Sequence, residues 1–474
     1  MSQFSSRPGA GATTGTLPAT ARPERLETPF GTMEYVDGLP TPETIGRGFD
    51  ALDLTRGIEA FLDCLPGAST VAVRRGLRRL VGDSTAIAYT DPRLTSGPLV
   101  LTGNTETTYG MTFLALDRDG PTVIEVPENS LSILNDLWQR YVADLGIAGP
   151  DRGEGGRYLV LPPDHDGDVP DGYFVVRSST FSCWAVFRTL GGVEALLRTR
   201  VYPLSAVADP PEQRFVDFAG SEIDTTAADD VSFFTALDEI VQEEPGALDP
   251  ERAGLLAALG IVPGQVFAPD ERMRSILDTA ARVGAGLART LVYKPRDPGV
   301  YYYPDSSWKN LFPSGSHEFR TSDGARQLDA RAVYHYGAVL VSPALAEAAV
   351  GVGSQYAYTA EDATGAWLDG GRSYTLTLPK DIPAENFWGV DVYDTTTRSL
   401  LRTGDPYPSV HSRSGAVAAE DTGETVVRFG PDAPRGREGI RTVPGKGFFV
   451  VLRLYGPLRS WFDQTWRPGE LEPE

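Results

Sequence analysis

Apolar residues recur at helical spacing in the first part of the chain. Thr41 precedes a proline and a glutamate, as at a helix N-terminus, and apolar side chains follow every three or four residues up to Pro66. This pattern predicts a helix over residues 42–65 that Pro66 ends. A second helix is predicted over residues 71–80, with a solvent-exposed basic face formed by Arg74, Arg75, Arg78 and Arg79.

Helical spacing returns in the middle of the chain. An apolar stripe runs over residues 233–241, a short helix is predicted over residues 255–259, and Asp270 is placed as the N-cap of a helix that continues to about residue 287. Residues 130–145 also carry apolar side chains three or four apart, which predicts one helix packed on a neighbouring sheet.

Short β-rich runs separated by turn residues occupy most of the remaining chain. They lie at residues 30–36, 98–102, 109–116, 121–126, 157–161, 173–177, 374–378, 387–393 and 448–454. Strands at this spacing with Gly and Pro turns favour antiparallel pairing. We therefore expect a mainly β, α+β protein: two antiparallel β-sandwich or jelly-roll-like domains joined by a helical segment.

The expected boundaries follow from these changes of pattern. Residues 1–28, rich in small and polar residues, are predicted to be a disordered tail. Residues 29–208 are expected to form an N-terminal β-rich domain with helices, residues 209–298 a helical connector, and residues 299–474 a C-terminal β-sandwich domain.

Charge and composition exclude several classes of partner. With 43 basic and 64 acidic residues among 474, the net charge is −21, which repels nucleic acid and anionic lipid. No apolar run approaches the roughly 20 residues of a spanning helix. We expect a soluble cytoplasmic protein, with homo-oligomerisation left open. Cys64 and Cys183 lie among apolar neighbours and are predicted to be buried free thiols.

Motifs of common cofactor and metal chemistry are absent from the sequence. It contains no H-E-x-x-H, C-x-x-C or G-x-S-x-G, and no nucleotide-binding fingerprint for NAD, FAD or ATP. The four histidines show no ligand spacing. We therefore expect neither a metal ion nor a cofactor.

One polar cluster stands at the start of a predicted strand. Asn104, Glu106 and Tyr109 bring together an amide, a carboxylate and a phenol, groups that orient ligands in apolar pockets. We assign Glu106 and Tyr109 as candidate acid/base residues and Asn104 as a candidate substrate ligand. The alternative is that Asn104 and the threonines around it only form hydrogen bonds with the backbone of their own turn.

Two arginines are candidates for holding an anionic group. Arg177 ends a β-rich run, and Arg331 is followed three residues later by Tyr334. Both arginines could instead be structural ion-pair partners. Arg331 and Tyr334 share a face only if their segment is helical, and we expect them to face Asn104, Glu106 and Tyr109 across a cleft between the two β domains.

Long ordered blocks also resemble a known family. They are residues 126–138, 149–162, 170–178, 260–264, 268–272, 351–356, 387–399, 443–447 and 453–457. In these blocks the chain resembles a two-domain bacterial family of paired domains of unknown function, catalogued as 1254 (N-terminal) and 1214 (C-terminal). The resemblance spans residues 35–468 and implies two β-rich, jelly-roll-like domains bridged by helices, but no established reaction.

The chain departs from the family pattern in two places. Residues 438–441 replace an expected Asn-Trp pair, and residues 341–344 replace an expected threonine-proline-alanine-methionine block. The function expected from the residues is that of an enzyme acting on a small organic metabolite by hydrolytic or lyase-type acid/base chemistry. The alternative is a non-catalytic protein that binds a sugar or an apolar ligand.

Overall fold

The computed structural model describes residues 24–82, 85–221, 223–414, 422–436 and 438–474. The chain divides into two compact units, Met1–Thr55 and Arg56–Glu474. Within the described ranges no helix is both long and apolar enough to cross a membrane. The predicted tail lies outside them up to residue 23, whereas Arg25–Thr28 forms a strand, so that prediction was wrong for these four residues.

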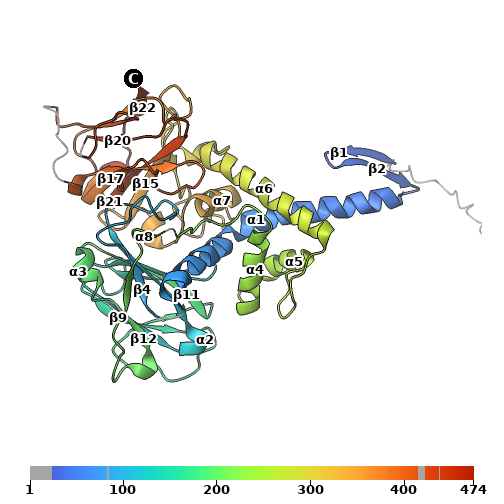
Figure 1. The fold of residues 1–474 in the computed structure, drawn as a ribbon, viewed down its shortest axis with the longest axis horizontal. Helices are drawn as coiled ribbons and strands as arrows, with labels where there is room; N and C mark the ends of the chain where they lie inside the picture. Colours follow the sequence, from blue (N-terminus) through green and yellow to red (C-terminus); the bar gives the residue numbers. More distant parts are fainter. Residues whose placement is uncertain (1–23, 83–84, 222, 415–421, 437) are drawn as a thin grey trace, which may run out of the picture. The chain divides into compact units, whose positions relative to one another are not determined.

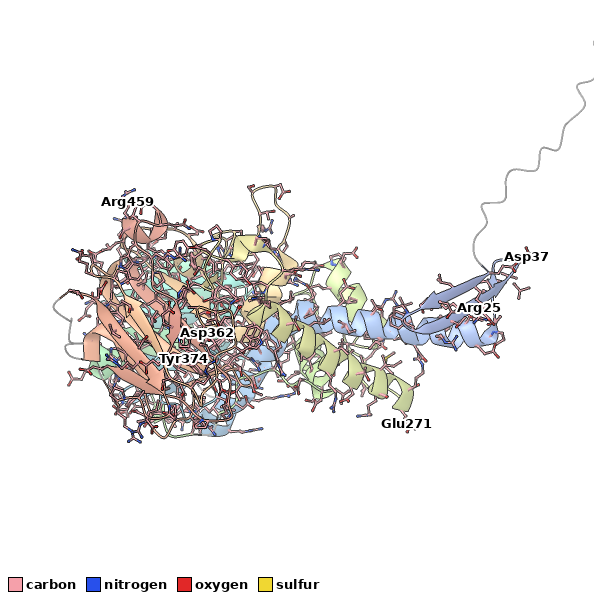
Figure 2. The ribbon with its side chains drawn as sticks, turned by 90° about the horizontal axis from the view of Figure 1, so that it is seen from above. Arg25, Asp37, Glu271, Asp362, Tyr374 and Arg459 are labelled. Atoms are coloured by element: carbon pink, nitrogen blue, oxygen red, sulfur yellow. The ribbon has the colours of Figure 1, made fainter. Side chains whose placement is uncertain are left out.

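The first unit contains a small antiparallel sheet and the start of a long helix. The sheet has the order β1-β2-β3, and Figure 2 labels Arg25 at its first strand and Asp37 at its second turn. Thr41 caps the helix as predicted, because its Oγ1 accepts a hydrogen bond from the Thr44 amide at 3.3 Å. The elements are β1 Arg25–Thr28, β2 Gly31–Val36, β3 Leu39–Pro40 and α1 Pro42–Val81.

Helix α1 runs through Pro66 without ending there, so the prediction of two helices was wrong. The proline has no amide hydrogen to donate, but its own carbonyl accepts hydrogen bonds from Thr70 Oγ1 and Gln139 Nε2, both at 2.9 Å. The predicted basic face is also wrong at Arg74. That side chain is 1% exposed and forms ion pairs with Glu239 at 2.6 Å and Glu243 at 2.5 Å.

Two sheets form the first β region of the larger unit. One has the order β13-β4-β5-β11-β7-β8 and the other β10-β9-β6-β12. Among the described pairs of these two sheets, β9/β10 and β4/β13 are parallel and the rest are antiparallel. One apolar core joins both sheets, through Leu114 and Ala185 of the first and Ile124 and Val160 of the second. The strands are β4 Ile87–Tyr89, β5 Thr108–Ala115, β6 Thr122–Val126, β7 Leu131–Asp136, β8 Tyr141–Gly146, β9 Gly156–Leu161, β10 Phe174–Arg177, β11 Ser182–Thr189, β12 Arg200–Pro203 and β13 Phe215–Asp217.

The helix predicted over residues 130–145 is instead the hairpin of β7 and β8. The spacing of apolar residues in this segment fits a helix, but Asp136 stabilises a turn between the two strands. Asp136 Oδ1 accepts hydrogen bonds from the amides of Trp138 and Arg140, both at 2.8 Å. Pairing with β11 then fixes β7 as a strand. Residues 98–102 also differ from prediction, since only Leu99 forms an isolated bridge there.

Two further sheets form the second β region. Their orders are β14-β15-β21-β17-β18 and β20-β19-β16-β22, and a second apolar core joins them, with Val390 and Leu452 from the first sheet and Leu376 and Val427 from the second. Figure 2 labels Tyr374, the first residue of β16. The strands are β14 Lys309–Asn310, β15 Ser354–Thr359, β16 Tyr374–Leu378, β17 Ala384–Asp394, β18 Ser409–His411, β19 Thr425–Gly430, β20 Gly439–Arg441, β21 Phe448–Pro457 and β22 Leu471–Pro473.

The longer helices of this unit after α1 lie between the two β regions in sequence. Asp270 caps α6 as predicted, accepting from the Met273 amide at 2.8 Å. In Figure 1, α7 and α8 appear between the green and cyan strands of the first β region and the orange and red strands of the second. The helices are α2 Leu116–Asp119, α3 Gly192–Leu196, α4 Ser232–Glu243, α5 Pro250–Ala258, α6 Glu271–Tyr293, α7 Leu328–Gly337, α8 Pro343–Ala346 and α9 Arg459–Phe462, with 3-10 turns at Leu204–Ala206, Pro298–Val300 and Ser412–Ser414.

The architecture is therefore α+β with mixed, mainly antiparallel sheets, as the sequence predicted. Both cysteines are free and buried, which confirms the expectation for Cys64 and Cys183.

Candidate functional site

A mainly apolar cavity lies between the two β regions and next to α7. The space in it that is open to the centre of a water-sized sphere is about 90 Å³. We call it the central cavity. The first β region contributes Tyr109, Met111, Ile133, Trp184 and Arg188; the second contributes Tyr356, Tyr358, Phe449, Val451 and Arg453; α7 and the residues after it contribute Val333, Tyr334, Gly337, Ala338, Val339 and Leu340.

Strand alternation explains why these side chains meet. On β5 and β11, Tyr109 lies directly opposite Arg188, so both project from the same face of the sheet. Alternate residues such as Leu114 and Ala185 project from the other face into the apolar core. On the second β region, Tyr356 of β15 lies opposite Arg453 of β21 in the same way.

Three buried arginines line the central cavity, and only one has a carboxylate partner among the described residues. Arg453 donates through Nε to Asp391 Oδ2 at 2.9 Å and through Nη2 to the Tyr393 hydroxyl at 2.7 Å. Arg188, which is 9% exposed, donates to the Leu131 carbonyl at 3.2 Å. Arg398, which is 7% exposed, donates to the Tyr336 carbonyl at 3.1 Å.

The polar cluster of Asn104, Glu106 and Tyr109, singled out in the sequence, lies beside the wall of the central cavity. Asn104 is fully buried; its Nδ2 donates to the Tyr455 hydroxyl at 2.6 Å, and its backbone amide donates to the Tyr109 hydroxyl at 3.2 Å. Its Oδ1 accepts from the amides of Glu106 and Thr107, both at 3.1 Å. Asn104 therefore both closes its own turn, as the alternative proposed, and joins the two β regions.

Glu106 lies against β17 of the second β region. A Cβ atom at Gly389 would stand 2.3 Å from Glu106 Oε1, so the strand can approach the carboxyl group only because residue 389 is glycine. Both carboxyl oxygens of Glu106 are buried without a hydrogen-bond partner in the described structure. Burial, and secondly the negative charge of Asp391, raise the pKa of Glu106 well above its ordinary value.

Asp391 is the second member of this buried acid pair. Burial raises its pKa to about 6, while the nearby Arg453 guanidinium acts in the opposite direction. Two carboxyl groups that share a buried site do not both ionise readily, and the charge of each raises the pKa of the other.

The structure brings together part of the predicted site. Tyr109 and Tyr334 both line the central cavity, and burial raises the pKa of each phenol. Asn104 and Glu106 contact the layer behind the wall and do not line the cavity. Arg331 and Tyr334 do lie on one helix, α7, but only Tyr334 lines the central cavity.

Two predicted ligands lie elsewhere. Arg331 does not line the central cavity; it forms an ion pair with Asp63 of α1. Arg177, an exposed residue at the end of β10, donates to the carbonyls of Pro162 at 3.2 Å and His165 at 2.9 Å. Arg331 has the ion-pair role that was the alternative for it, whereas Arg177 bonds to backbone carbonyls, and neither lines the central cavity.

Sequence reasoning missed Arg188, Asp391 and Arg453. Each is a charged residue inside a run of apolar strand residues, and a charge buried there needs a partner or a use. That signal was present in the sequence. Their proximity was not, because it depends on how two sheets distant in sequence face each other.

The family departures fall on different surfaces. Within residues 341–344, Val341 hydrogen bonds through its amide and carbonyl with the Asn135 side chain, at 2.9 and 2.8 Å. The segment 438–441 contains β20, and none of its residues lines the central cavity. Among the described residues, no three His, Cys, Asp or Glu side chains are arranged to hold a metal ion.

Comparisons with known proteins find solved structures that are similar to this chain. The VPA0106 protein from Vibrio parahaemolyticus, whose crystal structure matches over 89% of this chain and 100% of its own, has a TM-score of 0.51 and 15% identity, which shows a shared fold. An uncharacterised protein from Burkholderia cenocepacia matches over 91% of this chain and 96% of its own, with a TM-score of 0.40 and 12% identity. A comparison with curated proteins finds no match.

Two family models match the chain itself. Residues 85–203 match the protein of unknown function family DUF1254, and residues 353–459 match the family DUF1214, also described as proteins of unknown function. The first range lies in the first β region and the second in the second β region. The chain therefore belongs to the family in which a DUF1254 domain is followed by a DUF1214 domain.

Proposed function

We propose that the central cavity binds a small organic molecule with an apolar body and a carboxylate group, on which the protein acts as an acid/base enzyme of hydrolase or lyase type. The observation that carries this proposal is the pair Arg188 and Arg398. Both are at least nine-tenths buried, both line the cavity, and neither forms an ion pair with an acid in the described structure.

A buried guanidinium without a counter-ion is costly. The hydrogen bonds that these two arginines donate go to backbone carbonyls, and Arg398 also lies over the Tyr336 ring, 4.0 Å from its centroid. A ligand carboxylate would remove that cost, and an arginine fork matches its geometry. The aliphatic and aromatic walls favour an apolar ligand body. Together these features select an organic anion over an inorganic one.

Tyr109 is the residue we propose as the proton donor. Its phenol is on the cavity wall, its raised pKa keeps it protonated at neutral pH, and the Asn104 amide holds its oxygen in place. Asn104 and Glu106, which do not line the cavity, would act as positioning residues behind it. Tyr334, on the opposite wall, would contact the ligand.

A non-catalytic binding protein is the second candidate. It is favoured by the absence of any carboxylate among the lining residues of the central cavity, so that acid/base chemistry there rests on phenols alone. In that case a purely apolar ligand, or a sugar stacked on the tyrosines, would occupy the same space.

The two candidate functions predict different responses to a neutral molecule that has the shape of the carboxylate ligand. We would measure the thermal unfolding of the protein with benzoate and with benzamide, which share one shape. The proposal predicts stabilisation by benzoate that exceeds that by benzamide and that Arg188→Gln removes. Equal responses to both compounds would favour the apolar binder.

Catalysis needs a separate readout. The protein would be incubated with a panel of ester- and hydroxyl-bearing small carboxylates, with products detected by mass spectrometry. Tyr109→Phe should abolish turnover while keeping the stabilisation by benzoate. Turnover unaffected in that variant would show that Tyr109 is not the proton donor.

We also propose that each β region is a two-layered sandwich. This is supported by the single apolar core that joins the two sheets of each region.

A further inference from the structure

Helix α7 separates the central cavity from a second pocket. Tyr334 lines the central cavity, whereas Arg331 and His335, which lie one helical turn apart, line a second pocket. The space in it that is open to the centre of a water-sized sphere is about 220 Å³. Other residues of this second pocket come from the β7–β8 turn, from α5 and from the segment before α7. We call it the arginine pocket, defined by Asp63, Trp138, Arg252, Arg326, Arg331 and His335.

The arginine pocket has more positive than negative charge. Arg252 and Arg331 both donate to one carboxylate, that of Asp63. Arg326 has no ion-pair partner in the described part of the chain, and burial, with the charges of Arg252 and Arg320, lowers its pKa. The other acid of the lining, Glu318, is paired with Arg320 at 2.6 Å.

Asp249 is a further acid close to these arginines. Its Oδ2 lies 3.6 Å from Arg252, but its side chain is 51% exposed and it caps α5, so solvent and the helix share its charge. Arg252, Arg326 and Arg331 also line a neighbouring hollow, to which Glu59, Glu251 and Arg56 contribute. In the lining of the arginine pocket itself, these three arginines outnumber the two acids Asp63 and Glu318.

Three buried nitrogen atoms of lining residues have no hydrogen-bond partner. They are Trp138 Nε1, Arg331 Nε and His335 Nδ1, on side chains that are 6%, 6% and 5% exposed in the described structure. Burial, together with the charges of Arg331, Arg252 and Arg326, lowers the pKa of His335 to about 3, so its ring is neutral at pH 7. Unpartnered buried polar atoms are rare because each costs about 1–3 kcal/mol.

We propose that the arginine pocket is a second binding site, for a small molecule that carries a phosphate or carboxylate group. An oxyanion there would offset the charge of Arg326 and accept hydrogen bonds from Trp138 Nε1 and Arg331 Nε, which both carry a proton. The aromatic side chains Trp138 and Phe319 provide apolar surface for the body of the molecule. This site goes beyond the function proposed for the central cavity and does not depend on it.

Calorimetric titration of the full chain with inorganic phosphate and, separately, with acetate tests the proposal and distinguishes the two groups. We expect saturable binding of one anion, weakened about ten-fold or more in Arg326→Gln. Because Arg326 has no ion-pair partner, this variant should fold as the wild type does. Trp138→Phe, which removes one donor and keeps an aromatic ring, should weaken binding less.

Arg177→Gln is the control, because it removes the same charge from an exposed side chain that does not line the pocket. It should bind the anion as the wild type does. Arg188→Gln reports on the central cavity and should also leave this binding unchanged. Absence of saturable binding of both anions would overturn the proposal, as would equal weakening by Arg326→Gln and Arg177→Gln or loss of binding only in Arg188→Gln.

Discussion

The two faces of strand β21 have opposite compositions although both are buried. Leu452 and Leu454 project into the apolar core of the second β region, while Arg453 and Tyr455, the residues that alternate with them, project toward the first β region. All four are less than one-tenth exposed. Burial alone therefore does not distinguish the face of β21 that packs in the apolar core from the face that lies toward the central cavity.

The difference lies in how each face is stabilised. The core face relies on the transfer of apolar area from water, about 25 cal/mol per Å². The polar face relies on pairing: Arg453 with Asp391, and Tyr455 with Asn104 at 2.6 Å. Removing a partner from the polar face leaves a buried charge or donor, whereas removing a methyl group from the core face leaves a cavity.

The largest effect should come from Arg453→Met. It leaves Asp391 buried without its cation beside Glu106, and breaking such a pair costs about 3–5 kcal/mol. The free energy of unfolding in urea measures this loss. The double variant with Asp391→Asn should recover part of it, and strictly additive losses would show that the pair is not coupled.

Leu452→Ala, at the adjacent position on the core face, should cost about 2–5 kcal/mol through lost apolar burial and the resulting cavity. Unlike the change at Arg453, it should show no recovery in combination with Asp391→Asn. A double variant less destabilised than the sum of its parts would mean that the two faces do not act independently.

Glu106→Gln should have a smaller effect that depends on pH. The pKa of Glu106 is raised in the folded protein above its ordinary value of 4.5, so the folded state holds a proton that the unfolded state releases. Wild-type stability therefore falls as pH rises above about 4.5, and glutamine removes this loss. Urea unfolding at pH 4.5 and pH 8 should favour the variant more at pH 8; the opposite order would contradict the raised pKa.

The smallest effect is expected for Arg177→Gln. This exposed side chain donates only to two loop carbonyls, so its loss should cost about 0.5 kcal/mol and leave the benzoate response unchanged. Loss of the stabilisation by benzoate would show that Arg177 contributes to ligand binding.

Local signals in the sequence predicted much of the fold. The cap residues Thr41 and Asp270 lie at the helix starts they indicated, because a cap depends on neighbours within three residues. The hairpin of β7 and β8 was missed for the opposite reason: its apolar spacing fits a helix, and only pairing with β11 makes it a strand. Arg74 was misplaced because its two glutamate partners lie on α4.

The candidate site shows the same limit. Tyr109 and Tyr334 were singled out and line one cavity, and Asn104 and Glu106 lie just behind its wall. Arg331 was assigned to that cleft, but its position on α7 turns it toward Asp63. Which face of a helix meets which sheet depends on tertiary packing, and the spacing of two residues does not specify it.

A crystal structure of the protein soaked in benzoate would show where the carboxylate binds. We expect one benzoate in the central cavity, its carboxylate within hydrogen-bond distance of Arg188 or Arg398 and its ring against the apolar wall. An empty central cavity at a concentration that stabilises the protein, or a benzoate carboxylate bound away from both arginines, would contradict this expectation.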